Sequence, residues 1–175
     1  FFLLLPSSRA AIIDIALKLR NIITYTILVL SPSKFNDLHK SNSDNLNFIK
    51  ACLHNKSINS ILKKLENVKY DAILIDEFTP KEKYLDYLKK VPDVNDSVIL
   101  IPKGEKVHIS IAAASILAKT TRDSMMEEYD LQYPMYNWKK NKGYPTLEHK
   151  NAVAEHGTTP LHRMTFNMTI QLKLF

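Results

Sequence analysis

The chain has 175 residues, of which 45% are hydrophobic and 24% are charged. These proportions are those of a folded globular protein and exclude a disordered or fibrous chain. A chain of this length fits one domain that buries roughly two-thirds of its surface without disulfide bonds. The net charge of +6 and the pI of about 9.3 favour an anionic partner such as nucleic acid, although many basic proteins bind none.

Cysteine content and the longest apolar runs indicate the compartment. The single cysteine, Cys52, cannot form an internal disulfide and fits a reducing compartment, so we expect a cytoplasmic location. No apolar run reaches the roughly 18 to 20 residues of a membrane span. The apolar start, residues 1–5, is too short for the apolar region of a signal peptide and lacks its charged lead. We therefore expect no membrane partner, and we expect a monomer.

The first part of the chain predicts two helices and one strand. Apolar residues at helical spacing predict a helix over residues 8–20. Residues 22–30 are rich in β-branched side chains and predict a strand, which Pro32 ends. Residues 34–43 are expected to form a loop with a short helical turn. A second helix is predicted over residues 44–66, again from apolar side chains at helical spacing.

Two apolar strands then end next to acidic residues. Residues 72–75 precede Asp76, and residues 97–101 precede a turn that contains Glu105, with a helix predicted between the strands over residues 81–89. In open α/β sheets ligands gather at the carboxyl ends of the strands, so both carboxylates stand where a ligand would bind. Two such acids suggest a divalent metal ion, since Mg²⁺ prefers oxygen ligands. Taken alone, Asp76 has an alternative role as a residue that starts a loop.

The second half predicts a long helix, a basic aromatic stretch and a capped helix. Residues 108–130 predict a helix whose first turns carry small side chains, so it can pack closely behind the carboxylates. Residues 133–145 interleave four aromatic residues with three lysines, which suits phosphates and bases. The alternative is a solvated loop whose aromatic rings pack inward. Thr146 is expected to cap a short helix over residues 147–156, which Gly157 ends.

A series of motifs, long and in a fixed order, resembles one protein family, the type 2 ribonucleases H. The motifs of the second half are Lys103-Gly104-Glu105, residues 110–119, Thr121-Arg122-Asp123, Tyr133-Pro134, Lys142-Gly143-Tyr144-Pro145-Thr146, His149, Gly157, His162-Arg163 and Phe166. This half is closer to ribonuclease HII. The first half is closer to ribonuclease HIII, through Lys34-Phe35-Asn36, Asn47, Lys50-Ala51, His54-Asn55 and residues 75–78. The resemblance covers roughly residues 12–166.

The resemblance implies an α/β, ribonuclease H-like layered fold, with a mixed sheet flanked by helices. Family members hydrolyse the RNA strand of RNA/DNA hybrids with four carboxylates and two Mg²⁺ or Mn²⁺ ions. By position, Asp76 matches the third carboxylate and Glu105 the fourth, which makes both of them expected catalytic residues and metal ligands. The expected partner is an RNA/DNA hybrid or a DNA duplex that contains ribonucleotides.

The resemblance also implies which side chains contact the substrate. Tyr144 matches the tyrosine that stacks on a sugar at an RNA-to-DNA junction. The full expected set of substrate-binding residues is Lys103, Ser110, Ser115, Lys142 and Tyr144.

The start of the chain departs from the family. The first strand of the family supplies an Asp-Glu pair followed by a glycine-containing loop, and this sequence has neither. We therefore expect residues 1–175 to form a single catalytic domain that is incomplete at its N-terminus and lacks its first strand or strands. The chain would be a truncated fragment or a degenerate copy, and we expect it to be weak or inactive as an enzyme in isolation.

Two other functions fit the same residues. A nucleic-acid-binding module without hydrolysis would use the surface of residues 138–144, and its affinity would depend strongly on salt. A different two-metal nuclease or phosphoesterase would use the same two carboxylates, Asp76 and Glu105. A comparison of substrates separates them, because the resembled family needs at least one ribonucleotide.

Overall fold

The computed structural model of the chain describes residues 9–42, 46–66, 68–89, 91, 93–94 and 97–164. Parts of the predicted elements, namely residues 1–8, 43–45 and Phe166, lie outside the described residues. The chain divides into two compact units. Unit 1 is Phe1–Val29 with Asp44–Thr120, and unit 2 is Leu30–Ser43 with Thr121–Phe175. Within the described residues, no helix is long and apolar enough to cross a membrane.

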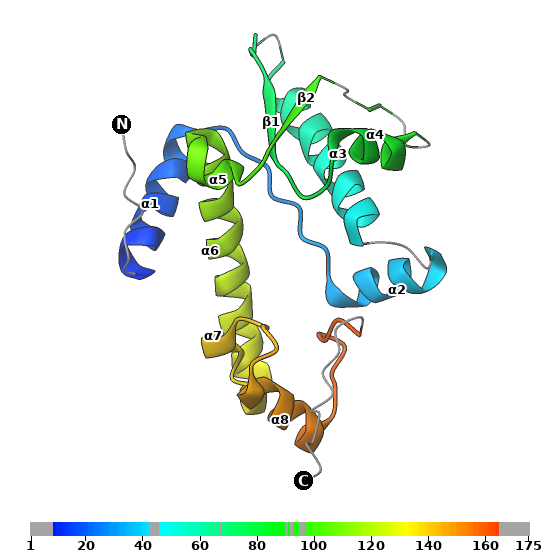
Figure 1. Cartoon of the computed structure of the whole chain (residues 1–175). Coiled ribbons are helices and arrows are strands. Elements are labelled where there is room, and N and C mark those ends of the chain that lie inside the picture. The colour runs from blue at the N-terminus through cyan, green and yellow to red at the C-terminus, as the bar shows by residue number, and fades with distance from the viewer. Residues whose placement is uncertain are drawn as a thin grey trace. The chain divides into compact units, whose positions relative to one another are not determined.

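Two short parallel strands form the described sheet of unit 1 (Figure 1). β1 (Ile73–Asp76) pairs with β2 (Val98–Ile101), and Asp76 lies opposite Ile101. Both strands were predicted, because β-branched apolar side chains favour paired strands. The connection between them contains α4 (Lys81–Leu88), since parallel neighbours need a crossover rather than a tight turn. Both strands therefore end at the same edge of the sheet.

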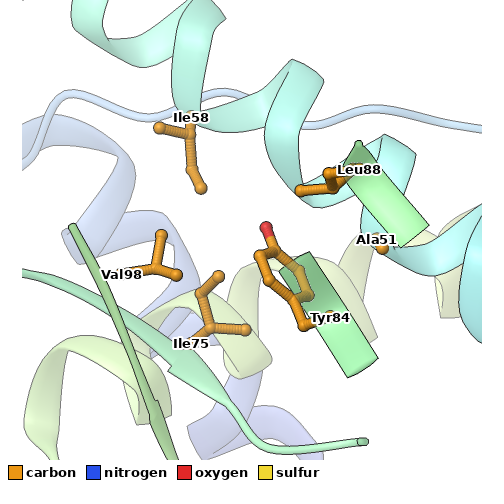
Figure 2. Packing of buried hydrophobic residues seen from close by; sticks show 6 residues of the cluster. All are labelled: Ala51, Ile58, Ile75, Tyr84, Leu88 and Val98. Carbon is orange, nitrogen blue, oxygen red and sulfur yellow. The ribbon is translucent and has the colours of Figure 1, made fainter. Parts of the chain in front are cut away.

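The helices α3 (Leu46–Lys64) and α4 pack against these strands. The buried side chains of this core come from both helices and both strands, and Figure 2 shows them converging: Ala51, Ile58, Ile75, Tyr84, Leu88 and Val98. Tyr84 is fully buried, and burial raises the pKa of Tyr84 to about 12. Its hydroxyl has no hydrogen-bond partner within the described part of the chain. The Tyr84 hydroxyl is therefore a buried polar group without a partner among the described residues.

A second cluster joins α1 (Arg9–Ile22) to the first half of α6 (Ile109–Gln132), on the side of the strands away from α4 (Figure 1). Its buried members are Ala16, Ile116 and Leu117, and the small side chain of Ala16 allows the helices to approach closely. Within unit 1, α3 and α4 thus pack against the strands, and α1 packs against α6. This arrangement agrees with the α/β layered fold predicted from the sequence.

The strand predicted over residues 22–30 is wrong, because residues 24–31 have no regular secondary structure. β-Branched side chains favour a strand only when a neighbouring strand supplies backbone partners. This segment instead contacts α3 through one backbone carbonyl and one hydroxyl group. Lys64 Nζ donates to the carbonyl of Tyr25 at 2.9 Å, and Thr26 Oγ1 lies 3.3 Å from the Ser60 hydroxyl.

Unit 2 contains a helix that the sequence analysis did not predict. α2 (Pro32–Asn42) replaces the loop expected over the described part of residues 34–43. Pro32 occupies the first helical position, where its missing N–H removes no helical hydrogen bond. Ser31 Oγ accepts a hydrogen bond from Lys34 N at 3.3 Å and caps the new helix. The prediction was wrong because it treated this proline as a stop signal, whereas it starts a helix.

The rest of unit 2 packs around aromatic rings contributed by η1 (Pro134–Tyr136) and α7 (Trp138–Asn141). The rings of Tyr136 and Trp138 stack with their centroids 5.0 Å apart, and both residues are buried. For these two rings, the alternative of inward packing is therefore confirmed.

The last described helix, α8 (Leu147–His156), agrees with its prediction. Thr146 Oγ1 accepts a hydrogen bond from His149 N at 3.2 Å, which caps the first turn. Gly157 follows the last turn with φ of 78°, a conformation that favours glycine. The cap and the stop residue were thus both predictable from the sequence.

Candidate active site

A hydrogen bond joins the carboxyl ends of the two strands. Asp76 ends β1 and is exposed, and Gly104 opens a one-turn helix, α5 (Gly104–Val107), soon after β2. Gly104 N donates to Asp76 Oδ1 at 2.7 Å. A Cβ atom at position 104 would lie 2.6 Å from Ile111 Cδ1 and 3.3 Å from Asp76 Oδ1. Glycine is therefore required here for close approach rather than for an unusual backbone conformation.

The neighbouring carboxylate, Glu105, is oriented by two side chains of α6. Ser115 Oγ donates to Glu105 Oε2 at 2.8 Å, and Lys119 Nζ donates to the same oxygen at 2.9 Å. The hydrogen bond from Lys119 lowers the pKa of Glu105, and the bond from Ser115 and the charge of Lys119 lower it further. Glu105 is therefore ionised at neutral pH.

Ser115 was a predicted substrate-binding residue, whereas Lys119 had no predicted role. The available signal was their spacing, because residues four apart on a helix lie on the same face. Because Ser115 contacts Glu105, Lys119 on the same face of α6 also lies close to Glu105.

The other two predicted substrate residues of unit 1 lie next to Glu105 in the chain or at the start of α6. Lys103 is exposed and has a left-handed conformation, with φ of 52°. Ser110 is exposed in the first turn of α6. Lys106 adds a further positive charge that lowers the pKa of Glu105. These lysines make the surroundings of Glu105 electropositive, which suits an anionic ligand.

Two residues of α3 support the chain just after Asp76. The ring of His54 meets the ring of Phe78 edge-on, with centroids 5.1 Å apart, and Lys50 Nζ lies 5.5 Å from the Phe78 centroid. Burial lowers the pKa of His54 and so does the charge of Lys50, whereas the charge of Asp76 raises it. His54 is therefore within electrostatic reach of Asp76.

The two carboxylates fit a hard divalent cation. Both supply oxygen, the donor that Mg²⁺ and Mn²⁺ favour, and Glu105 is held in its ionised form. Across the described residues, no group of three or more His, Cys, Asp or Glu side chains is arranged to hold a metal ion. Asp76 and Glu105 would therefore be part of a ligand set and not a complete one. Another acid, Asp14 of α1, forms an ion pair with Lys18.

Unit 2 carries the remaining predicted substrate residues, Lys142 and Tyr144. Tyr144 is 58% exposed, as a stacking residue needs to be. The Lys142 side chain is only 13% exposed, and its ammonium group donates to Glu127 Oε1 at 2.7 Å. Arg122, to which the sequence analysis gave no role, donates from Nη1 to the Tyr144 hydroxyl at 3.0 Å.

His149 and His162 take part in a buried hydrogen-bond network of unit 2. Trp138 Nε1 donates to His149 Nε2 at 3.1 Å, and His162 Nε2 lies 3.3 Å from the same nitrogen. Thr159 N donates to His162 Nδ1 at 2.9 Å, so this nitrogen is an acceptor and His162 Nε2 carries the proton. The network is satisfied when both histidines are neutral. Burial lowers the pKa of His162, as does the neighbouring His149.

Solved structures of one protein share this fold. Bst-RNase HIII in complex with Mn²⁺ matches with a TM-score of 0.75 at 23% sequence identity, over 93% of this chain and 54% of that chain. A mutant form of Bst-RNase HIII matches with a TM-score of 0.74. The chain therefore has the α/β fold of the type 2 ribonucleases H, as the motifs predicted.

Curated relatives named ribonuclease HII match the chain in sequence. The protein of Parabacteroides distasonis is 37% identical over 151 residues, which are 85% of this chain and 64% of the relative. The protein of Christiangramia forsetii is 35% identical over 147 residues, 76% of this chain and 74% of the relative. The protein of Bacteroides thetaiotaomicron is 48% identical over 98 residues, 54% of this chain and 48% of the relative.

The matched segment thus spans about half the length of the Bacteroides relative. The family model described as Ribonuclease HII covers nearly the whole chain, since it matches residues 7–169. That range contains both strands, the acidic residues Asp76 and Glu105, and Tyr144. The chain belongs to the ribonuclease HII family.

Proposed function

We propose that the chain acts in the endonucleolytic hydrolysis of the RNA strand of RNA/DNA hybrids. The observation that most supports this function is the hydrogen bond from Gly104 N to Asp76 Oδ1. Because Glu105 follows Gly104 directly, this bond supports the proposal that the two carboxylates act together at the carboxyl end of the parallel strands. Ligands of open α/β sheets bind at that end.

Asp76 and Glu105 would hold a Mg²⁺ or Mn²⁺ ion. Such ions, when bound in pairs, activate water and stabilise the leaving oxygen in phosphodiester hydrolysis. Ser115 and Lys119 both donate to Glu105 Oε2, so they orient the carboxylate and leave Oε1 as the oxygen that they do not occupy. Their second effect is to keep Glu105 ionised, which a cation ligand must be.

Exposed polar residues would bind the nucleic acid. Lys103 and Ser110 lie close to Glu105 in the chain and offer a positive charge and a hydroxyl for a phosphate. Tyr144 would stack on a sugar of the substrate, as the family resemblance implies. Lys142 would add positive charge nearby, although its ammonium group is already paired with Glu127.

A cleavage assay on the 175-residue chain tests this proposal. The substrate is an RNA/DNA hybrid labelled on each strand, incubated with Mn²⁺. We expect slow cleavage of the RNA strand alone, and loss of this cleavage in Asp76→Asn and in Glu105→Gln. Asp14→Asn is a matched control because this carboxylate lies on α1 and is paired with Lys18. Equal cleavage by the wild type and Asp76→Asn would refute the role of Asp76.

A second candidate is a nucleic-acid-binding module that does not hydrolyse its ligand. The specific observation in its favour is that the described residues hold no set of three metal ligands. The exposed lysines of α7, Lys139 and Lys140, would bind phosphates. This candidate predicts no cleavage, and it predicts hybrid binding that weakens when Lys139, Lys140 and Lys142 are neutralised but is unchanged in Asp76→Asn.

A further inference from the structure

One arginine holds the exposed ring of Tyr144. Arg122 Nη1 donates to the Tyr144 hydroxyl at 3.0 Å, and Arg122 Cζ lies over the ring, 5.4 Å from its centroid. The guanidinium group therefore engages both the hydroxyl and one face of the ring. With 58% of its surface exposed, Tyr144 keeps a large part of its side chain open to a ligand among the described residues.

The arginine is itself fixed by the next residue in the chain. Arg122 Nε and Nη2 both donate to Asp123 Oδ1, at 2.9 and 2.7 Å. The guanidinium thus uses Nη1 for Tyr144 and its other two nitrogens for Asp123. A planar group held through three nitrogens has a defined orientation, which a lysine ammonium group would not have.

The backbone of Tyr144 is also fixed. Tyr144 N donates to the carbonyl of Asn141 at 2.9 Å, and the Tyr144 carbonyl lies 3.0 Å from His149 Nδ1. Since His149 Nε2 accepts a hydrogen bond from Trp138, its Nδ1 carries the proton and donates to this carbonyl. Both ends of Tyr144 are therefore held before any ligand binds.

We infer that Arg122 is a positioning residue that presents Tyr144 as a one-sided stacking surface for a sugar or base of the nucleic-acid ligand, with Asp123 locking Arg122. This inference rests on the proposed function, in which Tyr144 contacts the substrate. A side chain that is ordered in advance loses less conformational entropy on binding. Arg122 therefore contributes to affinity through Tyr144 and not through a phosphate contact of its own.

Binding measurements on four variants test the inference. The full chain is titrated, in EDTA so that no cleavage occurs, against a fluorescein-labelled RNA/DNA hybrid. We expect Tyr144→Ala to weaken binding by about fivefold or more, the lower end of the range for stacking of one base on an aromatic ring. Arg122→Gln should lose part of this affinity. The double variant should bind like Tyr144→Ala alone, because a residue that acts through Tyr144 has no effect without it.

Arg122→Lys separates orientation from charge. It keeps the positive charge but loses the planar group, so we expect it to bind like Arg122→Gln. The dependence of affinity on salt should stay as in the wild type for both variants, whereas loss of a phosphate contact lowers the salt slope by about 1. Lys18→Gln is a control for removal of an exposed, ion-paired lysine of α1, outside the proposed contacts with nucleic acid. Urea unfolding of each variant shows whether the fold is retained.

Three results would overturn the inference while leaving the proposed function intact. They are wild-type affinity in Arg122→Gln, rescue of affinity by Arg122→Lys, and a double variant whose loss equals the product of the single losses. Wild-type affinity in Tyr144→Ala is a different failure, because it removes the proposed contact of Tyr144 itself and the inference with it.

Discussion

Replacement of Gly104 by alanine tests the close packing of Gly104 against Asp76 and Ile111. The added Cβ would lie 2.6 Å from Ile111 Cδ1, which is closer than two carbon atoms can approach, and 3.3 Å from Asp76 Oδ1. Ile111 is buried, so its side chain can move only by displacing its neighbours. We therefore expect Gly104→Ala to destabilise unit 1 and to displace Asp76.

The expected change in the unfolding free energy of Gly104→Ala is the difference between two opposing effects. Overpacking by one carbon atom costs about 1–3 kcal/mol. Alanine also lowers the conformational entropy of the unfolded chain relative to glycine, which stabilises the folded state by about 0.4–1 kcal/mol. Because Ile111 is buried and moves only with its neighbours, the middle of the first range applies, and the net loss of unfolding free energy should be about 1 kcal/mol.

Urea unfolding of the single and double variants measures this value. Ile111→Val removes the Cδ1 atom that clashes and should cost about 0.5–1.5 kcal/mol alone. In Gly104→Ala/Ile111→Val the clash is absent, so the double variant should be more stable than the sum of the two single losses predicts. An alanine variant as stable as the wild type, or strictly additive losses, would refute the close-approach explanation for Gly104.

The other predictions concern cores, caps and pH. Tyr84→Phe removes a buried hydroxyl that has no partner within the described residues, so it should raise the unfolding free energy by about 1 kcal/mol; a lower thermal midpoint would contradict this. Thr146→Ala removes the cap of α8 and should cost about 1 kcal/mol in urea unfolding, whereas Thr146→Ser should cost less, and equal losses would argue against the cap. The pKa of His162 is lowered below its usual 6.5, so below about pH 6.5 the unfolded chain takes up a proton that the folded chain resists, and stability falls with pH. The urea midpoint should therefore drop less between pH 7 and pH 5 in His162→Gln than in the wild type, and an equal drop would exclude His162 as the cause.

Elements with a strong local pattern could be predicted from the sequence. The strand that ends at Asp76 and the strand before Glu105 are short apolar runs between polar residues, and both occur in the structure. The cap at Thr146 and the stop at Gly157 were predictable because each depends on one side chain and its immediate backbone.

Elements whose conformation depends on a partner could not be predicted in the same way. Residues 22–30 have the composition of a strand, but their backbone conformation depends on a neighbouring strand that composition cannot supply. Pro32 both ends an extended segment and starts α2, and the sequence alone did not decide between these two roles.

Contacts across long sequence distances account for what was missed at the candidate site. The five predicted substrate residues were identified from matched motifs. The contact between Arg122 and Tyr144 was missed because it joins residues 22 positions apart. No periodic pattern links such residues. The same limit applies to the pair of His149 and His162, which the motifs marked without indicating that the rings meet.

The central claim is that Asp76 and Glu105 bind the same divalent cation at the carboxyl end of the two strands. Titration of the chain with Mn²⁺, followed by the electron paramagnetic resonance signal of the free ion, tests this claim without any need for cleavage. We predict saturable binding by the wild type and by Asp14→Asn, and at least about tenfold weaker binding by Asp76→Asn and by Glu105→Gln, since each loses one charged oxygen ligand. Equal Mn²⁺ affinity in the wild type and in both of these variants would contradict it.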